Sequence, residues 1–119
     1  AINYALTWPE RKSLKSSIKK LPLKELFFRK TKKNEFKCLD LCIKALKLGG
    51  SAPTILNAAN EVAVENFLQN KIKFTDIPVI IDQALKSIKI TKAQSIKSLL
   101  LCDEHTREYV KRYIDKKWK

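Results

Sequence analysis

The sequence contains no methionine, one histidine, two glycines, four prolines and three cysteines. So few glycines and prolines argue against turn-rich all-β folds and against low-complexity linkers. An odd number of cysteines cannot form a complete set of disulfides, which favours a reducing compartment. The longest apolar run falls well short of the roughly 20 residues that a membrane-spanning helix requires, so we expect no membrane partner. Without an initiating methionine, we expect Ala1 to be a processed end or the first residue of a piece of a longer protein.

The composition that remains is globular and strongly basic. Apolar residues make up 45% of the 119 residues and charged residues 31%, which suits one small domain rather than separate cofactor and substrate domains. The 25 Lys and Arg exceed the 12 Asp and Glu and leave a net charge of +13. One hypothesis is therefore an independent basic module that binds nucleic acid or acidic surfaces. Against it, 21 of the 25 basic residues are lysine, whereas phosphate recognition tends to use the planar arginine fork.

The N-terminal third is predicted to contain a strand and a linker. Residues 1–8 alternate between apolar and other residues with a period of two, which predicts a β-strand that ends at Pro9. The strand has no partner in this sequence, so we expect it to complete a sheet elsewhere. Residues 11–37 carry eleven basic and two acidic residues, a net charge of +9. We interpret residues 9–37 as an extended, solvated basic linker rather than a binding arm.

Helical periodicity extends through almost all of residues 38–119. It predicts an all-α fold in which the isolated strand and the basic linker precede a four-helix bundle. The first helix should end at Gly49 and Gly50, which reach the left-handed conformation without strain. The second helix, roughly 53–69, has Ser51 as its expected N-cap. Because this helix is apolar on both sides, we expect it to lie at the centre of the bundle.

Two further helices complete the predicted bundle. The third follows a cap at Thr75 or Asp76, and its apolar residues recur at helical spacing: Ile77, Ile80, Ile81, Ala84, Leu85 and Ile88. Residues 96–100 form a short apolar turn or helix, after which Asp103 is expected to cap the last helix. The expected inner face of the last helix consists of Thr106, Tyr109, Val110, Tyr113 and Ile114.

Three polar residues on the second helix are the candidate site. Asn57, Asn60 and Glu61 would be enclosed if this helix is central, and a buried polar group without a partner costs about 1–3 kcal/mol. We therefore predict that Asn57, Asn60 and Glu61 hold a structural hydrogen-bond network.

The remaining reactive side chains do not form a recognisable catalytic, cofactor or metal site. Cys38, Cys42, Cys102 and His105 supply four zinc-type ligands, but their spacing is not that of a zinc knuckle. We interpret Cys38 and Cys42 as small core residues, Cys102 as the residue before a helix cap, and His105 as a surface or cap residue.

Two further patterns also lack residues that a metal site or a phosphate-binding loop requires. Glu61 and Glu65 lie one turn apart but lack the Glu-x-x-His partner of a bundle di-metal site. The two glycines are adjacent, whereas a phosphate-binding loop needs several that are spaced after a strand. The residues by themselves therefore predict no catalytic, cofactor-binding or metal residue.

Four segments, in order along the chain, carry a resemblance to a known family: YALTWPER at 4–11, the Cys38–Leu39 pair, GGSAPTILNAANEVAV at 49–64 and FTDI at 74–77. Together they resemble the C-terminal part of the 1-deoxy-D-xylulose 5-phosphate reductoisomerase family. The most specific element is LNAANE after GGSAP, and it falls on the helix that the apolar pattern places at the centre.

The resemblance implies a function for a larger enzyme. Members of the family convert 1-deoxy-D-xylulose 5-phosphate to 2-C-methyl-D-erythritol 4-phosphate with NADPH and a divalent cation, Mg or Mn, in non-mevalonate isoprenoid biosynthesis. The resemblance implies that residues 1–8 are the closing strand of a central catalytic domain, 9–37 the linker and 38–119 the C-terminal bundle.

The resemblance also implies where the chemistry and the partners of the chain lie. The catalytic and cofactor residues would be outside this sequence, so the fragment alone is expected to bind no cofactor and to be inactive. Its partner would be the catalytic domain of the same enzyme, a homodimer, with no nucleic-acid partner. The location would be a bacterial cytoplasm, or a plastid-type organelle in a eukaryote.

Overall fold

The computed structural model of the chain describes residues 2–10, 12, 27–32, 35–92 and 95–118. The chain divides into two units, Ala1–Lys30 and Thr31–Lys119, and each is described by itself. Much of the basic linker predicted over residues 9–37 lies outside the described residues. No β-strand occurs in the described part of the chain, and the secondary structure there is helical.

The first unit corrects the prediction of a strand at residues 1–8. Residues Ile2–Thr7 form a short helix, α1, and the hydroxyl of Thr7 donates to the carbonyl oxygen of Glu10 at 2.7 Å just beyond its end. The rings of Tyr4 and Trp8, four residues apart, meet edge to face with centroids 5.5 Å apart. A segment with no neighbouring strand must satisfy its backbone groups locally, which a helix does and a strand cannot.

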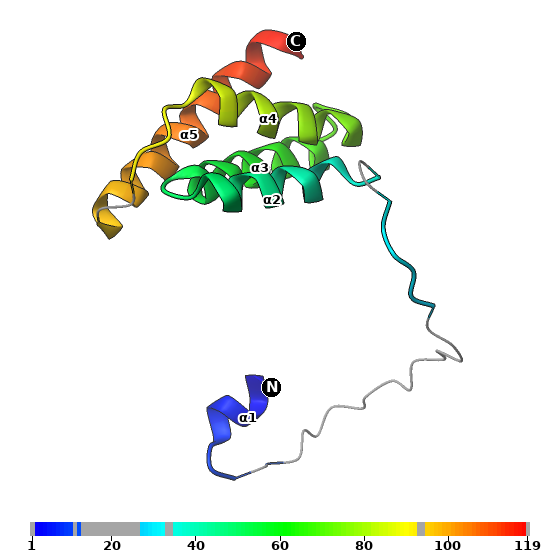
Figure 1. Cartoon of the computed structure of the whole chain (residues 1–119), viewed down its shortest axis with the longest axis vertical. Helices are drawn as coiled ribbons and strands as arrows, with labels where there is room; N and C mark the ends of the chain where they lie inside the picture. Colours follow the sequence, from blue (N-terminus) through cyan, green and yellow to red (C-terminus); the bar gives the residue numbers. More distant parts are fainter. Residues whose placement is uncertain (1, 11, 13–26, 33–34, 93–94, 119) are drawn as a thin grey trace. The chain divides into compact units, whose positions relative to one another are not determined.

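The second unit is the predicted four-helix bundle (Figure 1). It contains α2 (Lys37–Leu48), α3 (Ala52–Leu68), α4 (Ile77–Ser87) and α5 (Ile96–Lys117), with a 3-10 turn, η1 (Phe74–Asp76), directly before α4. Helix α3 contacts α2, α4 and α5. The prediction that this helix lies at the centre is therefore confirmed.

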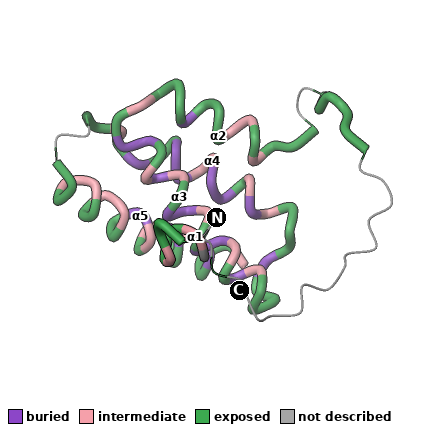
Figure 2. Tube along the Cα trace, turned by 90° about the horizontal axis from the view of Figure 1, so that it is seen from below, coloured by how far each residue is buried: buried purple, intermediate pink, exposed green. Residues whose placement is uncertain are grey.

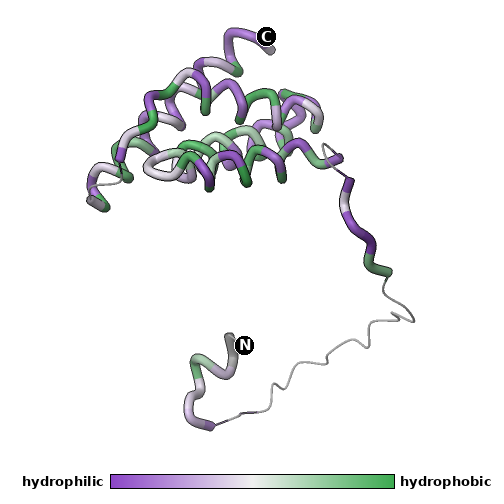
Figure 3. Tube along the Cα trace, in the orientation of Figure 1, coloured by the Kyte–Doolittle hydropathy of each residue, from purple (hydrophilic) through white to green (hydrophobic). Residues whose placement is uncertain are grey.

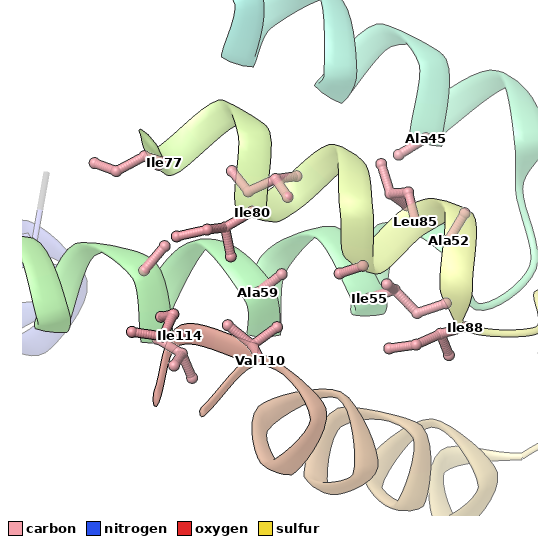
Figure 4. Packing of buried hydrophobic residues seen from close by; sticks show 14 of the residues in the cluster. Ala45, Ala52, Ile55, Ala59, Ile77, Ile80, Leu85, Ile88, Val110 and Ile114 are labelled. Atoms are coloured by element: carbon pink, nitrogen blue, oxygen red, sulfur yellow. The ribbon is translucent and has the colours of Figure 1, made fainter. Parts of the chain in front are cut away.

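The core of the bundle lies where α3, α4 and α5 meet (Figure 4). All six apolar residues predicted for the inner face of α4 are buried: Ile77, Ile80, Ile81, Ala84, Leu85 and Ile88. From α5, Thr106, Val110 and Ile114 are buried, while the rings of Tyr109 and Tyr113 are half-buried against the same core. The predicted inner faces of both helices are thus confirmed.

The turn between α2 and α3 is held against the segment that follows α4. Gly49 and Gly50 have φ of +64° and +56°, as the predicted helix end requires, and a Cβ on Gly50 would collide with the carbonyl oxygen of Thr91. Ser51 stands at the predicted N-cap position but its hydroxyl does not cap α3. Instead it accepts the backbone N–H of Thr91 at 3.0 Å, while the N–H of Ser51 donates to the Thr91 carbonyl at 2.8 Å.

Helix α5 begins earlier than predicted. Ser95, not Asp103, is its N-cap, and it exchanges side-chain and backbone hydrogen bonds with Ser98. The 22 residues of α5 are continuous because no glycine or proline interrupts them and the serine pair satisfies the first turn. Asp103 lies inside the helix and engages Arg107 one turn later, so its expected capping role is wrong.

Candidate functional site

The LNAANE motif turns its small residues inward and its polar residues outward. Ala58 and Ala59 of α3 are fully buried, whereas Asn57 and Glu61 are exposed and Asn60 is half-buried. The expectation that these three polar side chains are enclosed is therefore corrected for this chain. Helix α3 is covered by its neighbours along its alanine face, and Asn57 and Glu61, one turn apart, lie outside that face.

Two of the three predicted network residues are hydrogen-bonded to one another, and α5 joins them. The amide of Asn57 donates to Glu61 Oε1 at 2.9 Å, and Arg107 Nη2 donates to Glu61 Oε2 at 2.6 Å. Arg107 also donates from Nε to Asp103 Oδ2 at 2.5 Å and from Nη2 to Asp103 Oδ1 at 3.3 Å. We call Asn57, Glu61, Asp103 and Arg107 the Arg107 cluster. Asn60, the third residue of the predicted network, does not belong to this cluster in the described part of the chain.

The electrostatics of the Arg107 cluster suit positioning rather than proton transfer. Hydrogen bonds from Arg107 and then from Asn57 lower the pKa of Glu61, and those to Asp103 and Glu61 raise the pKa of Arg107. Glu61 is therefore an ionised carboxylate near neutral pH with both oxygens already accepting hydrogen bonds, which makes it a poor general base. Because the Glu61 side chain is 52% exposed, solvent screens the pair, which links α5 to α3 at one point.

Arg107 is the residue of this cluster that the sequence reasoning did not identify. The spacing of Asp103 and Arg107, four residues apart on one helix, is a recognised signal for an ion pair. Its contact with Glu61 spans 46 positions, and no local pattern predicts such a long-range contact.

A second charged group joins α2 to α4. Asp82 of α4 lies 3.5 Å from Nζ of Lys44 on α2 and 2.5 Å from Nζ of Lys86 on its own helix. The hydrogen bond from Lys86 is the largest cause of the lowered pKa of Asp82, with Lys44 contributing less. Beside this group lies an open groove of about 400 Å³ between the two helices, lined by Lys37, Asp40, Leu41, Lys44, Pro78, Val79 and Asp82.

The cysteines are free thiols in different surroundings. Cys38 and Cys102 pack against the core, whereas Cys42 is exposed on α2, so its predicted core position is wrong. Cys102 lies within α5 rather than before its cap. Burial, and then the neighbouring Cys42, raises the pKa of Cys38, which suppresses the reactive thiolate.

No metal centre is assembled in the part of the chain that the structure describes. There, no three His, Cys, Asp or Glu side chains are grouped to hold an ion, and His105 is exposed on α5. Within the same residues, no helix combines the length and the apolar character needed to cross a membrane. The fold and the charged groups that join its helices define a helical-bundle module.

Comparison with known proteins identifies the family of this module. A family model described as the DXP reductoisomerase C-terminal domain matches residues 1–109, and the chain belongs to this family. The resemblance drawn from the sequence motifs is thereby confirmed.

Bacterial relatives give the same result. The chain is 42% identical over 121 residues to the 1-deoxy-D-xylulose 5-phosphate reductoisomerase of Acinetobacter baumannii, and this match covers 99% of the chain but 30% of the relative. It is 44% identical over 113 residues to the enzyme of the same name from Clostridium tetani, covering 92% of the chain and 29% of that enzyme. The chain therefore spans less than a third of the length of these relatives. The matches give no support to an independent nucleic-acid-binding module.

Proposed function

We propose that this chain is the C-terminal helical module of a reductoisomerase that converts 1-deoxy-D-xylulose 5-phosphate to 2-C-methyl-D-erythritol 4-phosphate. The observation that carries the proposal is the family match over residues 1–109 together with relatives of which the chain covers only 30%. Residues 9–37 would be the linker and 38–119 the bundle. The partner would be the catalytic domain of the same polypeptide, in a homodimeric enzyme of the bacterial cytoplasm.

The described residues do not fit the cofactors of that reaction. NADPH binding by a glycine-rich loop needs spaced glycines between a strand and a helix, whereas Gly49 and Gly50 are adjacent and end a helix. A divalent cation needs several oxygen ligands that converge, and no such group is placed among the described residues. In this proposal, NADPH and the cation belong to the two-thirds of the enzyme that this chain does not match.

The contribution of the module is mechanical. Burial of apolar area, at about 25 cal/mol per Å², gives the bundle a core of its own, and exposed ion pairs add little to it. A body that folds around its own core can hold a neighbouring domain in a defined position. The Arg107 cluster adds a polar link between α5 and α3 to this core.

The proposal is tested by measuring oxidation of NADPH in the presence of 1-deoxy-D-xylulose 5-phosphate and Mn²⁺. The three samples are this chain alone, the A. baumannii enzyme without its matching 121 residues, and a chimera in which this chain replaces them. We expect turnover by the chimera and none by the chain alone. Turnover by the chain alone, or a chimera no more active and no more stable than the truncated enzyme, would refute the proposal.

A further inference from the structure

Helix α2 carries an apolar stripe that the bundle leaves largely exposed. Leu39, Cys42, Ile43 and Leu46 lie at i, i+3, i+4 and i+7, which places them on one face of a helix. Leu39 is 46% exposed, Ile43 45% and Leu46 76%, and Cys42 is exposed as well. We call these four residues the outer stripe of α2. Figure 2 shows how much of α2 is exposed, and Figure 3 shows hydrophobic residues recurring along it.

The face of α2 that adjoins the stripe is the one that the bundle uses. Cys38, Leu41 and Ala45 pack against the core, and Ala45 is the buried residue of this helix. Helix α2 is therefore apolar on two sides and covered on one. A single exposed leucine needs no explanation, but a helix that is apolar on both sides is typical of a buried position. A contiguous exposed apolar face indicates a contact that is completed elsewhere.

We propose that the outer stripe of α2 is the surface on which the catalytic domain of the same polypeptide docks. This inference rests on the proposed function, and it names the surface through which the bundle would contact the catalytic domain. The relatives extend over about three times the length of this chain, which covers 30% of the A. baumannii enzyme. Helix α2 is the first helix of the second unit and follows residues 31–36 directly. In the proposed function the linker of residues 9–37 ends at α2, so a catalytic domain attached through it is tethered to this helix.

The charges around the stripe favour such a domain over a second copy of this chain. Lys47 borders the stripe and is exposed, whereas Lys44 is paired with Asp82. Two copies of a chain with net charge +13 that met through this face would bring their lysines together, and like charges across an interface disfavour association. The complementary surface is therefore expected to be apolar with carboxylates at its rim.

The test compares two double variants in the chimera with the A. baumannii enzyme. The stripe variant is Ile43→Glu with Leu46→Glu. The control variant is Leu68→Glu with Leu101→Glu, since Leu68 is 72% and Leu101 58% exposed on other helices. Both variants exchange exposed apolar residues for two carboxylates, so they differ in position and not in chemistry. In the 119-residue chain, both should keep the helicity and the unfolding midpoint of the unaltered bundle.

In the chimera, we expect the stripe variant to lose NADPH oxidation on warming about tenfold faster than the control, because its carboxylates enter an apolar interface. Equal inactivation of the two variants in an active chimera would overturn the inference and leave the proposed function standing. A chimera no more active and no more stable than the truncated enzyme would refute both. Sedimentation of the 119-residue chain should show a monomer, and a dimer that the stripe variant abolishes would assign the stripe to a second copy and overturn the inference.

Discussion

Helices α2 and α4 are neighbours of nearly equal length, 12 and 11 residues, and they use their apolar residues differently. Every apolar residue on the predicted inner face of α4 is buried. In α2, Ala45 is buried, while Leu39, Ile43 and Leu46 are exposed. The apolar side chains of α4 are mostly buried by other parts of this chain, whereas those of α2 are buried on one side of the helix only.

The difference between the two helices distinguishes apolar residues that stabilise the bundle from apolar residues that are available to bind a partner. A single apolar stripe at helical spacing specifies one packing face. Two stripes on one helix specify two faces, and the structure shows what covers one of them. Substitutions in α4 should therefore change the stability of the bundle itself, and substitutions in the outer stripe of α2 should not.

The largest expected effect comes from shortening a core side chain of α4. Ile80 is fully buried, so Ile80→Ala should destabilise the chain by about 2–5 kcal/mol through lost burial and the cavity left behind. The matched variant Ile43→Ala in α2 should cost less than about 1 kcal/mol. Urea unfolding followed by circular dichroism measures both. Equal losses of unfolding free energy in the two variants would contradict the difference proposed between α2 and α4.

A smaller effect is expected at the turn that joins α2 to α3. Gly50→Ala places a Cβ against the Thr91 carbonyl at positive φ, which should cost about 2 kcal/mol or more. Gly49→Ala leaves its new Cβ with nothing within 4 Å, but at φ +64° and ψ −158° it occupies a region that only glycine reaches easily, so it should also cost about 1–3 kcal/mol. The thermal midpoints test this, and a Gly50→Ala variant as stable as the unaltered chain would mean that the turn is not held against Thr91.

The smallest effect concerns the ion pair that links α2 to α4. The pKa of Asp82 is lowered in the folded chain, so its contribution to stability is complete above about pH 5 and is lost as the pH falls through 3.9, the ordinary value, towards the folded pKa. Its side chain is 32% exposed, and screening keeps the contribution below about 1 kcal/mol.

Asp82→Asn should remove this part of the acid dependence of stability. Denaturant unfolding measured between pH 3 and pH 6 should show a shallower decline on the acid side. An unchanged slope for Asp82→Asn would show that the lysines do not stabilise this carboxylate.

Local sequence patterns were sufficient to predict the elements whose structure depends on residues close together in the chain. The inner face of α4, the proline in its first turn and the glycines after α2 were predicted, because apolar periodicity and backbone preference act within a few residues. The same reasoning placed α3 at the centre, since it is apolar on two sides. The family resemblance came from the motifs that follow Gly49, and the family match confirmed it.

The errors arose where distant residues decide the outcome. The alternation of residues 1–8 suits a strand only if another strand lies beside it, and the described residues contain none. Asp103 has the chemistry of a cap, but Ser95 and Ser98 form one earlier and Arg107 binds Asp103 within the helix. The exposure of Asn57 and Glu61 depends on which sides of α3 its neighbours cover, which the sequence of α3 does not contain.

Amide hydrogen exchange on the 119-residue chain tests most directly the claim that the bundle is complete around α3 and incomplete at α2. Amides that exchange only by global unfolding report the full stability, and those released by local opening report less. The account predicts that amides in the middle of α3 and α4 exchange at the slow global rate, while those along α2 exchange faster. Equal protection of α2 and α4 would contradict it, because α2 would then need no further partner to be as stable as the core.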